Sequence, residues 1–224
     1  MEVVTILKLP ERLRRRTISL NAYSQYPWIL CLILSFMAPV APAWAGEWLH
    51  AGAHELALKG GYSIRHDTDE SYGRGRDMEG IHLLPHYGYT LTNEKGAGWI
   101  RGNLSLLLEP TLIRLDHEQT RDLYGVAVLG RWMLSRWDAV RPYLEGGGGI
   151  LFGRPCLRGR SDCNTNFVLQ GGPGILIRTA EREAFTVGYR FHHISNSDTC
   201  DDSDANRGID SSLFLIGVSC FLNN

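Results

Sequence analysis

Residues 184–195 read AFTVGYRFHHIS, and this stretch decides how the rest of the chain is interpreted. Its odd-numbered positions from 185 to 191 are apolar or aromatic, whereas its even-numbered positions include Thr186, Arg190 and His192. Because successive side chains of an extended strand point to opposite faces, this stretch forms a strand with one apolar face and one polar face. The alternation therefore predicts a β-strand whose two faces meet different surroundings.

Seven further stretches show alternating apolar character and are separated by polar, turn-forming segments. With the first, the predicted strands run approximately over Glu55–Ile64, Met78–Leu91, Gly98–Ile113, Leu123–Met133, Val140–Phe152, Phe167–Arg178, Ala184–Ser195 and Ile209–Leu222. No window after residue 45 approaches the length of apolar sequence that a membrane-spanning helix needs. The chain is therefore predicted to be all-β.

The composition is that of one domain of ordinary size. The 224 residues carry a formal net charge of −1, so no basic patch of the kind that binds nucleic acid is expected. We expect no nucleic-acid partner.

The N-terminal segment has the features of an export signal. A basic cluster at residues 12–16 precedes the apolar run Trp28–Val40, and small residues lead to a cleavage site after Ala45. The alternative is a retained membrane anchor, which Pro39 and Pro42 disfavour because they break the run. We expect residues 1–45 to be a signal peptide and residues 46–224 to form the barrel domain.

An exported chain with one apolar and one polar face per strand can close into either of two barrels. One is a soluble, lipid-carrying barrel with its apolar face inward, and the other is an outer-membrane barrel with its apolar face toward lipid. Connection lengths favour the second, because long polar connections are expected after the first, third, fifth and seventh strands. These connections are Arg65–Asp77, Arg114–Asp122, Gly153–Asn166 and Asn196–Gly208. The prediction is an eight-stranded antiparallel transmembrane β-barrel in the bacterial outer membrane, with its long loops outside the cell.

The interior of an eight-stranded barrel is filled by side chains, so a pore is not expected. The residues predicted to face inward include charged and polar side chains that can pair with one another, namely His82, Arg101, Glu109, Arg141, Glu145 and Arg190. We interpret them as a buried polar network that fills the lumen.

His193 and Ser195 continue the outward, apolar face of the seventh strand. An unpaired polar group at the hydrocarbon boundary costs about 1 to 3 kcal/mol, so a purely structural role there is hard to defend. The segment from Asn206 to Asp210 opens the last strand and brings a carboxylate to the same turn. A base, a hydroxyl and a carboxylate around one turn are the three parts of a serine hydrolase.

The His193–Asn196 segment and the Asn206–Asp210 segment resemble the outer-membrane lipid A 3-O-deacylases of the PagL type, an acyloxyacyl-hydrolase-like family. The stretches Leu108–Pro110 and Arg141–Gly146 are also similar to this family. The resemblance implies an eight-stranded barrel that removes the ester-linked acyl chain at the 3-position of lipid A. It also implies lipid A or lipopolysaccharide as the substrate and the outer membrane as the surroundings.

The resemblance further implies a role for each matching residue. Ser195 is expected to be the nucleophile, His193 the base, Asp210 the acid that orients the imidazole, and Asn196 the donor that stabilises the oxyanion. The family usually has glutamate at the position of Asp210. Four acids in the preceding connection, Asp198, Asp201, Asp202 and Asp204, compete for that role or form a solvated loop.

The cysteines and histidines show no spacing typical of metal ligands, so we expect no metal and no cofactor. Cys31 leaves with the signal, and Cys156, Cys163, Cys200 and Cys220 leave three disulfide pairings open. Two other functions also stay open: a structural or adhesion barrel without activity, and an outer-membrane phospholipase. A homodimer is possible, and the sequence does not decide whether two barrels pair.

Overall fold

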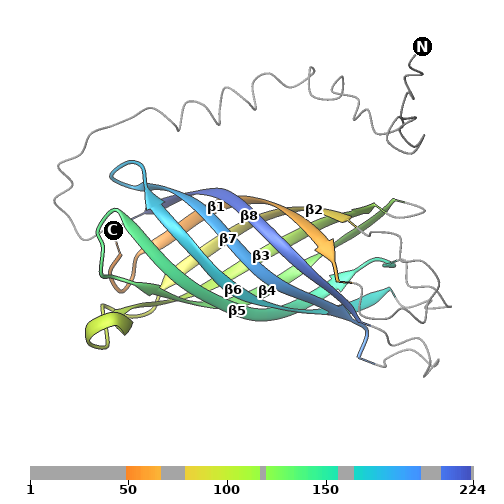
Figure 1. The fold of residues 1–224 in the computed structure, drawn as a ribbon, viewed down its shortest axis with the longest axis horizontal. Helices are drawn as coiled ribbons and strands as arrows, with labels where there is room; N and C mark the ends of the chain where they lie inside the picture. The colour runs from red at the N-terminus through yellow and green to blue at the C-terminus, as the bar shows by residue number, and fades with distance from the viewer. Residues whose placement is uncertain (1–48, 67–78, 117–119, 156–163, 198–207, 223–224) are drawn as a thin grey trace, which may run out of the picture. The chain divides into compact units, whose positions relative to one another are not determined.

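A computed structural model describes residues 49–66, 79–116, 120–155, 164–197 and 208–222 of the chain. The described residues form eight antiparallel strands in one closed barrel, in the order β1-β2-β3-β4-β5-β6-β7-β8 (Figure 1). The predicted signal peptide, the four loop aspartates, Cys156, Cys163 and Cys200 lie outside the described residues. Within the described ranges, no helix has the length and apolar character needed to cross a membrane.

The observed strands agree closely with the predicted ones. They are β1 His54–Arg65, β2 Glu79–Thr90, β3 Gly102–Asp116, β4 Arg121–Leu134, β5 Val140–Phe152, β6 Thr165–Arg178, β7 Glu183–Ser195 and β8 Ile209–Leu222. The largest difference is at the start of β3, because residues Gly98–Ile100 form a short 3-10 helix, η3. Gly96 and Gly98 there have φ of 86° and 61°, a left-handed backbone that ends strand pairing.

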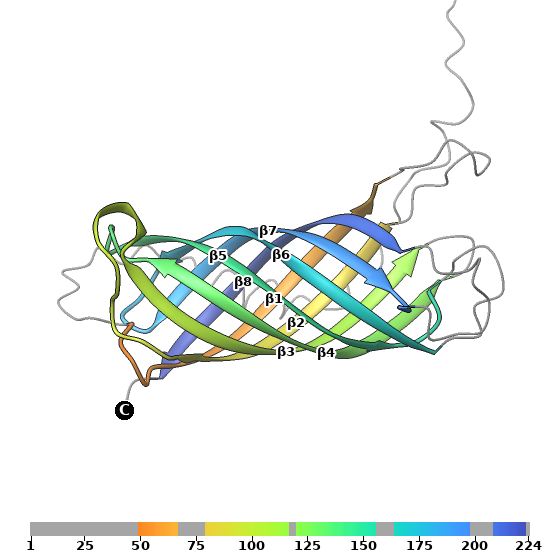
Figure 2. The same cartoon turned by 90° about the horizontal axis from the view of Figure 1, so that it is seen from below.

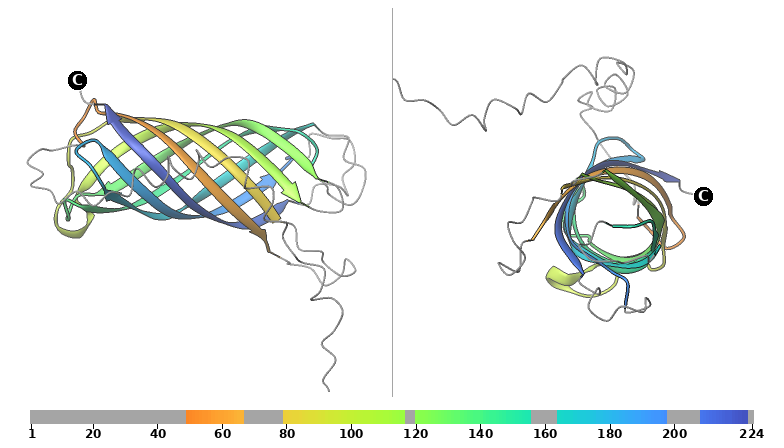
Figure 3. Two further views of the ribbon diagram at one scale, coloured as in Figure 1. Left: turned by 90° about the horizontal axis from the view of Figure 1, so that it is seen from above. Right: turned by 90° about the vertical axis from the view of Figure 1, so that its right-hand side faces the viewer.

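Each strand pairs with its sequence neighbour, and β1 closes the barrel by pairing with β8. The strands run obliquely to the barrel axis, and the view along that axis shows a closed ring (Figures 2 and 3). Closure leaves no unpaired strand edge, which is what a sheet needs where no water can satisfy its backbone groups.

The two faces of the barrel match the alternation of the sequence. The outward face exposes large apolar side chains along every strand, among them Leu58, Ile81, Leu108, Val128, Leu144, Leu169 and Ile216. Inward side chains such as Lys59, Glu109 and Arg131 have no exposed surface. The chain thus has its apolar side outside, the arrangement of a membrane barrel rather than of a soluble one.

The centre of the lumen holds a charged network in which three carboxylates meet three cations, Glu55, Glu109, Glu145, Lys59, Arg131 and Arg190. The Arg190 guanidinium lies 2.6 Å from Glu109 and 2.7 Å from Glu145. Of the residues predicted to face inward, Glu109, Glu145 and Arg190 belong to this network. His82 and Arg141 are buried as well, but their partners are Ser63 and Glu94. Arg101 is a correction. Arg101 lies before β3, and its side chain is 60% exposed and pairs with Glu94.

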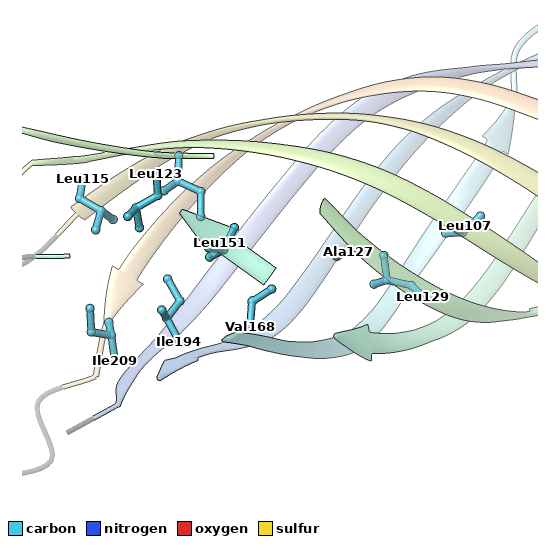
Figure 4. Close-up of a cluster of buried hydrophobic side chains, with 10 residues drawn as sticks. Leu107, Leu115, Leu123, Ala127, Leu129, Leu151, Val168, Ile194 and Ile209 are labelled. Atoms are coloured by element: carbon cyan, nitrogen blue, oxygen red, sulfur yellow. The ribbon is translucent and has the colours of Figure 1, made fainter. Parts of the chain in front are cut away.

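The lumen also contains an apolar layer that the alternation did not predict. Ten buried side chains cluster there, including Leu151, Val168, Ile194 and Ile209 (Figure 4). Two of its members, Ile194 and Ile209, lie on the inner side of the segments that carry His193 and Asp210, so this part of the layer packs beneath the candidate site. It holds these strand ends in place from inside the barrel.

Connection lengths follow the expected asymmetry only in part. At the end of the barrel that carries His193, the connections span residues 66–78, 117–120, 153–164 and 196–208. At the other end they span 91–101, 135–139 and 179–182. The connection after β2 is longer than predicted because β3 begins four residues later than the sequence pattern indicated. The connection after β3 is shorter because β3 ends three residues later and β4 begins two residues earlier.

Candidate active site

His193 on β7 and Asp210 on β8 lie opposite each other in the sheet and are joined by a hydrogen bond. They are register partners, and His193 Nδ1 lies 2.6 Å from Asp210 Oδ1. Their side chains are 36% and 33% exposed, on the outward face of the barrel. The carboxylate thus occupies Nδ1, which leaves Nε2 as the nitrogen available for proton transfer.

Ser195 is the last residue of β7, two positions after His193 and therefore on the same face of the strand. Its register partner on β6 is Phe167. Among the described residues, no hydrogen bond joins Ser195 to the imidazole. Apo enzymes often hold such contacts loosely and tighten them when substrate binds.

Asn196 follows directly after β7 and is only 4% exposed. The next residue, Ser197, has φ of 50°, so the chain turns away from the strand here. Asn196 is thus adjacent to Ser195 in sequence but more buried than the three residues of the expected triad. It belongs to the first turn of the connection, and strand alternation does not fix where its side chain points.

The backbone under the site is anchored on the inner side. Ile194 and Ile209 are register partners, 2% and 3% exposed, and both belong to the apolar layer of the lumen. Each is adjacent in sequence to a member of the His193–Asp210 pair. Their packing restricts the backbone that carries the imidazole and the carboxylate.

Gly208 provides the space that the imidazole occupies. A Cβ built on Gly208 would lie 2.3 Å from His193 Cε1, 3.0 Å from Nε2 and 3.1 Å from Nδ1. Separations this short are not tolerated, so any larger residue at 208 displaces the ring. Gly208 belongs to the sequence motif, but the motif does not indicate its role. Its contact with His193 joins the start of β8 to β7, so it depends on how the two strands pair.

The two sides of the site differ in polarity. On the β6 side lie Phe167 and Leu169, of which Leu169 is 65% exposed. On the other side, His66 Nε2 lies 2.7 Å from Ser212 Oγ, and Tyr189 Oη lies 3.2 Å from the same hydroxyl. The sequence interpretation missed these three polar residues, since His66 belongs to the other end of the chain.

The described part of the chain contains no group of three or more His, Cys, Asp or Glu side chains arranged to hold a metal ion. Cys220 lies on β8 with a free, exposed thiol. It is far along β8 from Asp210, so it does not take part in the site.

Comparison with known proteins gives the family. The sequence model of the family "Lipid A 3-O-deacylase (PagL)" matches residues 76–219, well over half of the chain. No curated protein matches the sequence. Among solved structures, the outer membrane enzyme PagL is similar, with a TM-score of 0.50 and 16% identity over 73% of this chain and 97% of that one.

Neisserial surface protein A (NspA) is equally similar in fold, with a TM-score of 0.50 and 16% identity over 75% of this chain and 98% of that one. At this level of identity, both similarities show only that the fold is an outer-membrane barrel. The family is shown by the match of the sequence model. The chain therefore belongs to the PagL family of lipid A 3-O-deacylases and is a β-barrel of the bacterial outer membrane.

Proposed function

We propose that this protein hydrolyses the 3-O-linked acyl ester of lipid A with Ser195, His193 and Asp210, at the rim of the barrel in the outer leaflet. The observation that carries the proposal is the 2.6 Å bond between His193 Nδ1 and Asp210 Oδ1 on the outward face. An imidazole that faces lipid and is hydrogen-bonded to a carboxylate has no packing role. An esterase that acts on a lipid needs a base of this kind at the lipid-facing surface.

In the proposed reaction, Ser195 Oγ attacks the ester carbonyl carbon while His193 Nε2 takes the hydroxyl proton. Asp210 keeps the proton on Nδ1 and stabilises the imidazolium. Asn196 donates to the developing oxyanion, and such a donor contributes about 3 to 4 kcal/mol in the transition state.

His193 then returns its proton to the sugar oxygen, which leaves as an alcohol. Water, deprotonated by the same imidazole, cleaves the acyl-enzyme and releases a fatty acid. Every proton in the cycle is thus taken up and returned by His193. The lipid products are a free fatty acid and lipid A with one acyl chain fewer.

The proposal is tested by mass spectrometry of lipid A after incubation with the purified protein and with its Ser195→Ala form. We expect the wild type to remove one acyl chain and the variant to lose activity by a factor of about 10³ or more. Heat-dependent gel mobility shows whether each barrel is folded. Lipid A left intact by a folded wild type would refute the enzyme and favour a structural or adhesion role.

Two further variants assign the acid. Asp210→Asn keeps the size of the side chain but no longer fixes the tautomer, so kcat should fall by about 10⁴. Asp210→Glu restores the residue usual in the family and should keep most of the activity. Offering phospholipid beside lipid A separates the deacylase from a phospholipase, since a deacylase leaves the phospholipid intact.

A further inference from the structure

The outward face of the barrel carries a second polar cluster directly beside the His193–Asp210 pair. It consists of His66, which directly follows β1, Ser212 of β8 and Tyr189 of β7. Ser212 Oγ lies 2.7 Å from His66 Nε2 and 3.2 Å from Tyr189 Oη. We call these three residues the lateral cluster.

The lateral cluster is physically connected to the proposed catalytic pair. The backbone N–H of His66 donates to the carbonyl oxygen of Asp210 at 2.8 Å. The His66 ring lies 6.0 Å from the ring of Phe191, which is the register partner of Ser212. A substrate at His193 and Asp210 that extends along β8 would therefore reach this cluster.

The lateral cluster has three polar hydrogens but only two hydrogen bonds among its members. With a neutral imidazole, tyrosine, serine and histidine each carry one polar hydrogen, and the two bonds within the cluster use two of the three. Whichever way the bonds run, the third hydrogen has no acceptor among the described residues. On a lipid-facing surface this donor needs an acceptor, because an unpaired polar group there costs free energy.

The depth of the cluster indicates which acceptor it meets. Ser212 follows Asp210 by two residues on the same face of β8, about 7 Å further along the strand and away from the rim. The sugar and phosphates of lipid A lie at the rim, and the acyl linkages lie just below them. The cluster donors are hydroxyl and imidazole groups without a fixed charge, which suit a neutral carbonyl better than a phosphate.

We propose that the lateral cluster binds the carbonyl oxygen of a second acyl linkage on the same lipid A molecule and so places the 3-O ester at Ser195. This inference rests on the proposed deacylase function. The three residues act as positioning residues, since they hold a neighbouring part of the substrate rather than the reacting atoms. The apolar β6 side then receives the acyl chain.

The test uses Tyr189→Phe and Ser212→Ala in the full chain. Tyr87→Phe is the matched control, because the Tyr87 hydroxyl also faces outward and bonds to a histidine, His54 Nδ1 at 2.5 Å, at the opposite end of the barrel. We expect both cluster variants to raise KM for lipid A about five- to tenfold, the loss of one hydrogen bond. The control should not change KM.

A p-nitrophenyl fatty-acid ester, which has only one acyl linkage, is the comparison substrate. Its kcat and KM should be the same in all three variants. Equal losses on lipid A and on this ester would overturn the proposal, because the cluster would then act on the catalytic pair itself. An effect that disappears with dephosphorylated lipid A would also overturn it, since the ligand would be a phosphate.

Binding separates this inference from the proposed function. The same substitutions in a Ser195→Ala background should weaken lipid A binding by the same factor in detergent micelles, without any turnover. If the wild type bound lipid A through this cluster but did not hydrolyse it, only the deacylase proposal would fail. Unchanged binding in both variants would overturn the lateral cluster.

Discussion

At the scale of single residues, the imidazole of His193 depends on the absence of one side chain. Gly208 lies so close to the ring that a Cβ would come within 2.3 Å of Cε1. Asp210 holds the ring through a 2.6 Å hydrogen bond, so a shift of the ring away from a Cβ at 208 strains or breaks that bond. Position 208 therefore needs a glycine, because any side chain there would occupy the space of the His193 ring.

Gly208→Ala should consequently misplace the imidazole and lower kcat about 100-fold, a loss that a displacement of about 1 Å at a reacting group can cause. The matched control is Gly60→Ala, because a Cβ at Gly60 on β1 meets nothing within 4 Å. Steady-state rates on lipid A check both. Full activity of a folded Gly208→Ala protein would mean that the ring does not occupy this space during the reaction.

At the scale of the elements, facing strands share their charges across the lumen. Arg190 of β7 contacts Glu109 of β3 and Glu145 of β5, and all three side chains are buried. A buried charge whose partner is removed stays desolvated without compensation. The network thus links strands that are not neighbours in the sheet.

Arg190→Met removes the shared cation and leaves Glu109 and Glu145 with fewer partners, so we expect a loss of about 3 to 5 kcal/mol in the free energy of unfolding. Urea unfolding in lipid vesicles measures it. The control is Arg114→Ala, which removes an ion pair with Asp122 that is exposed to solvent. Its unfolding midpoint should stay at the wild-type value, and equal midpoints for both variants would contradict the expected role of the network.

At the scale of the whole molecule, the proposed function requires one orientation of the barrel in the membrane. The candidate site lies at the end that carries the connections 66–78, 153–164 and 196–208. Outer-membrane barrels place their longer loops outside the cell, where the outer leaflet presents lipopolysaccharide. The same end must therefore face the medium if the proposed substrate is correct.

An epitope inserted at Thr120, on the connection between β3 and β4, should accordingly bind antibody on intact cells. The same epitope at Asp138, on the opposite end between β4 and β5, should bind only after the outer membrane is permeabilised. Both residues are exposed and lie outside strands, so insertion should leave the barrel intact. The reverse pattern of labelling would place the site in the periplasm.

Most of the fold was predictable because the side-chain period of a strand is a local property. The alternation over β5 and β8 predicted both strands to the residue, and it placed Phe191 outside and Arg190 inside. It failed for Arg101, where glycines with left-handed backbone end the pairing. It also missed the apolar layer around Leu151. Alternation shows which side chains face the lumen, but it does not show how polar and apolar side chains are grouped along the barrel axis.

The sequence alone determined which residues form strands, which face of each strand is apolar, and that His193 and Asp210 approach each other across one connection. The tertiary structure decided what surrounds them. Gly208 meets the imidazole through the register of β7 with β8, and His66 reaches Ser212 only because β1 closes the barrel against β8. Contacts of this kind join residues far apart in the chain, and they depend on strand register and closure, which no local pattern of residues contains.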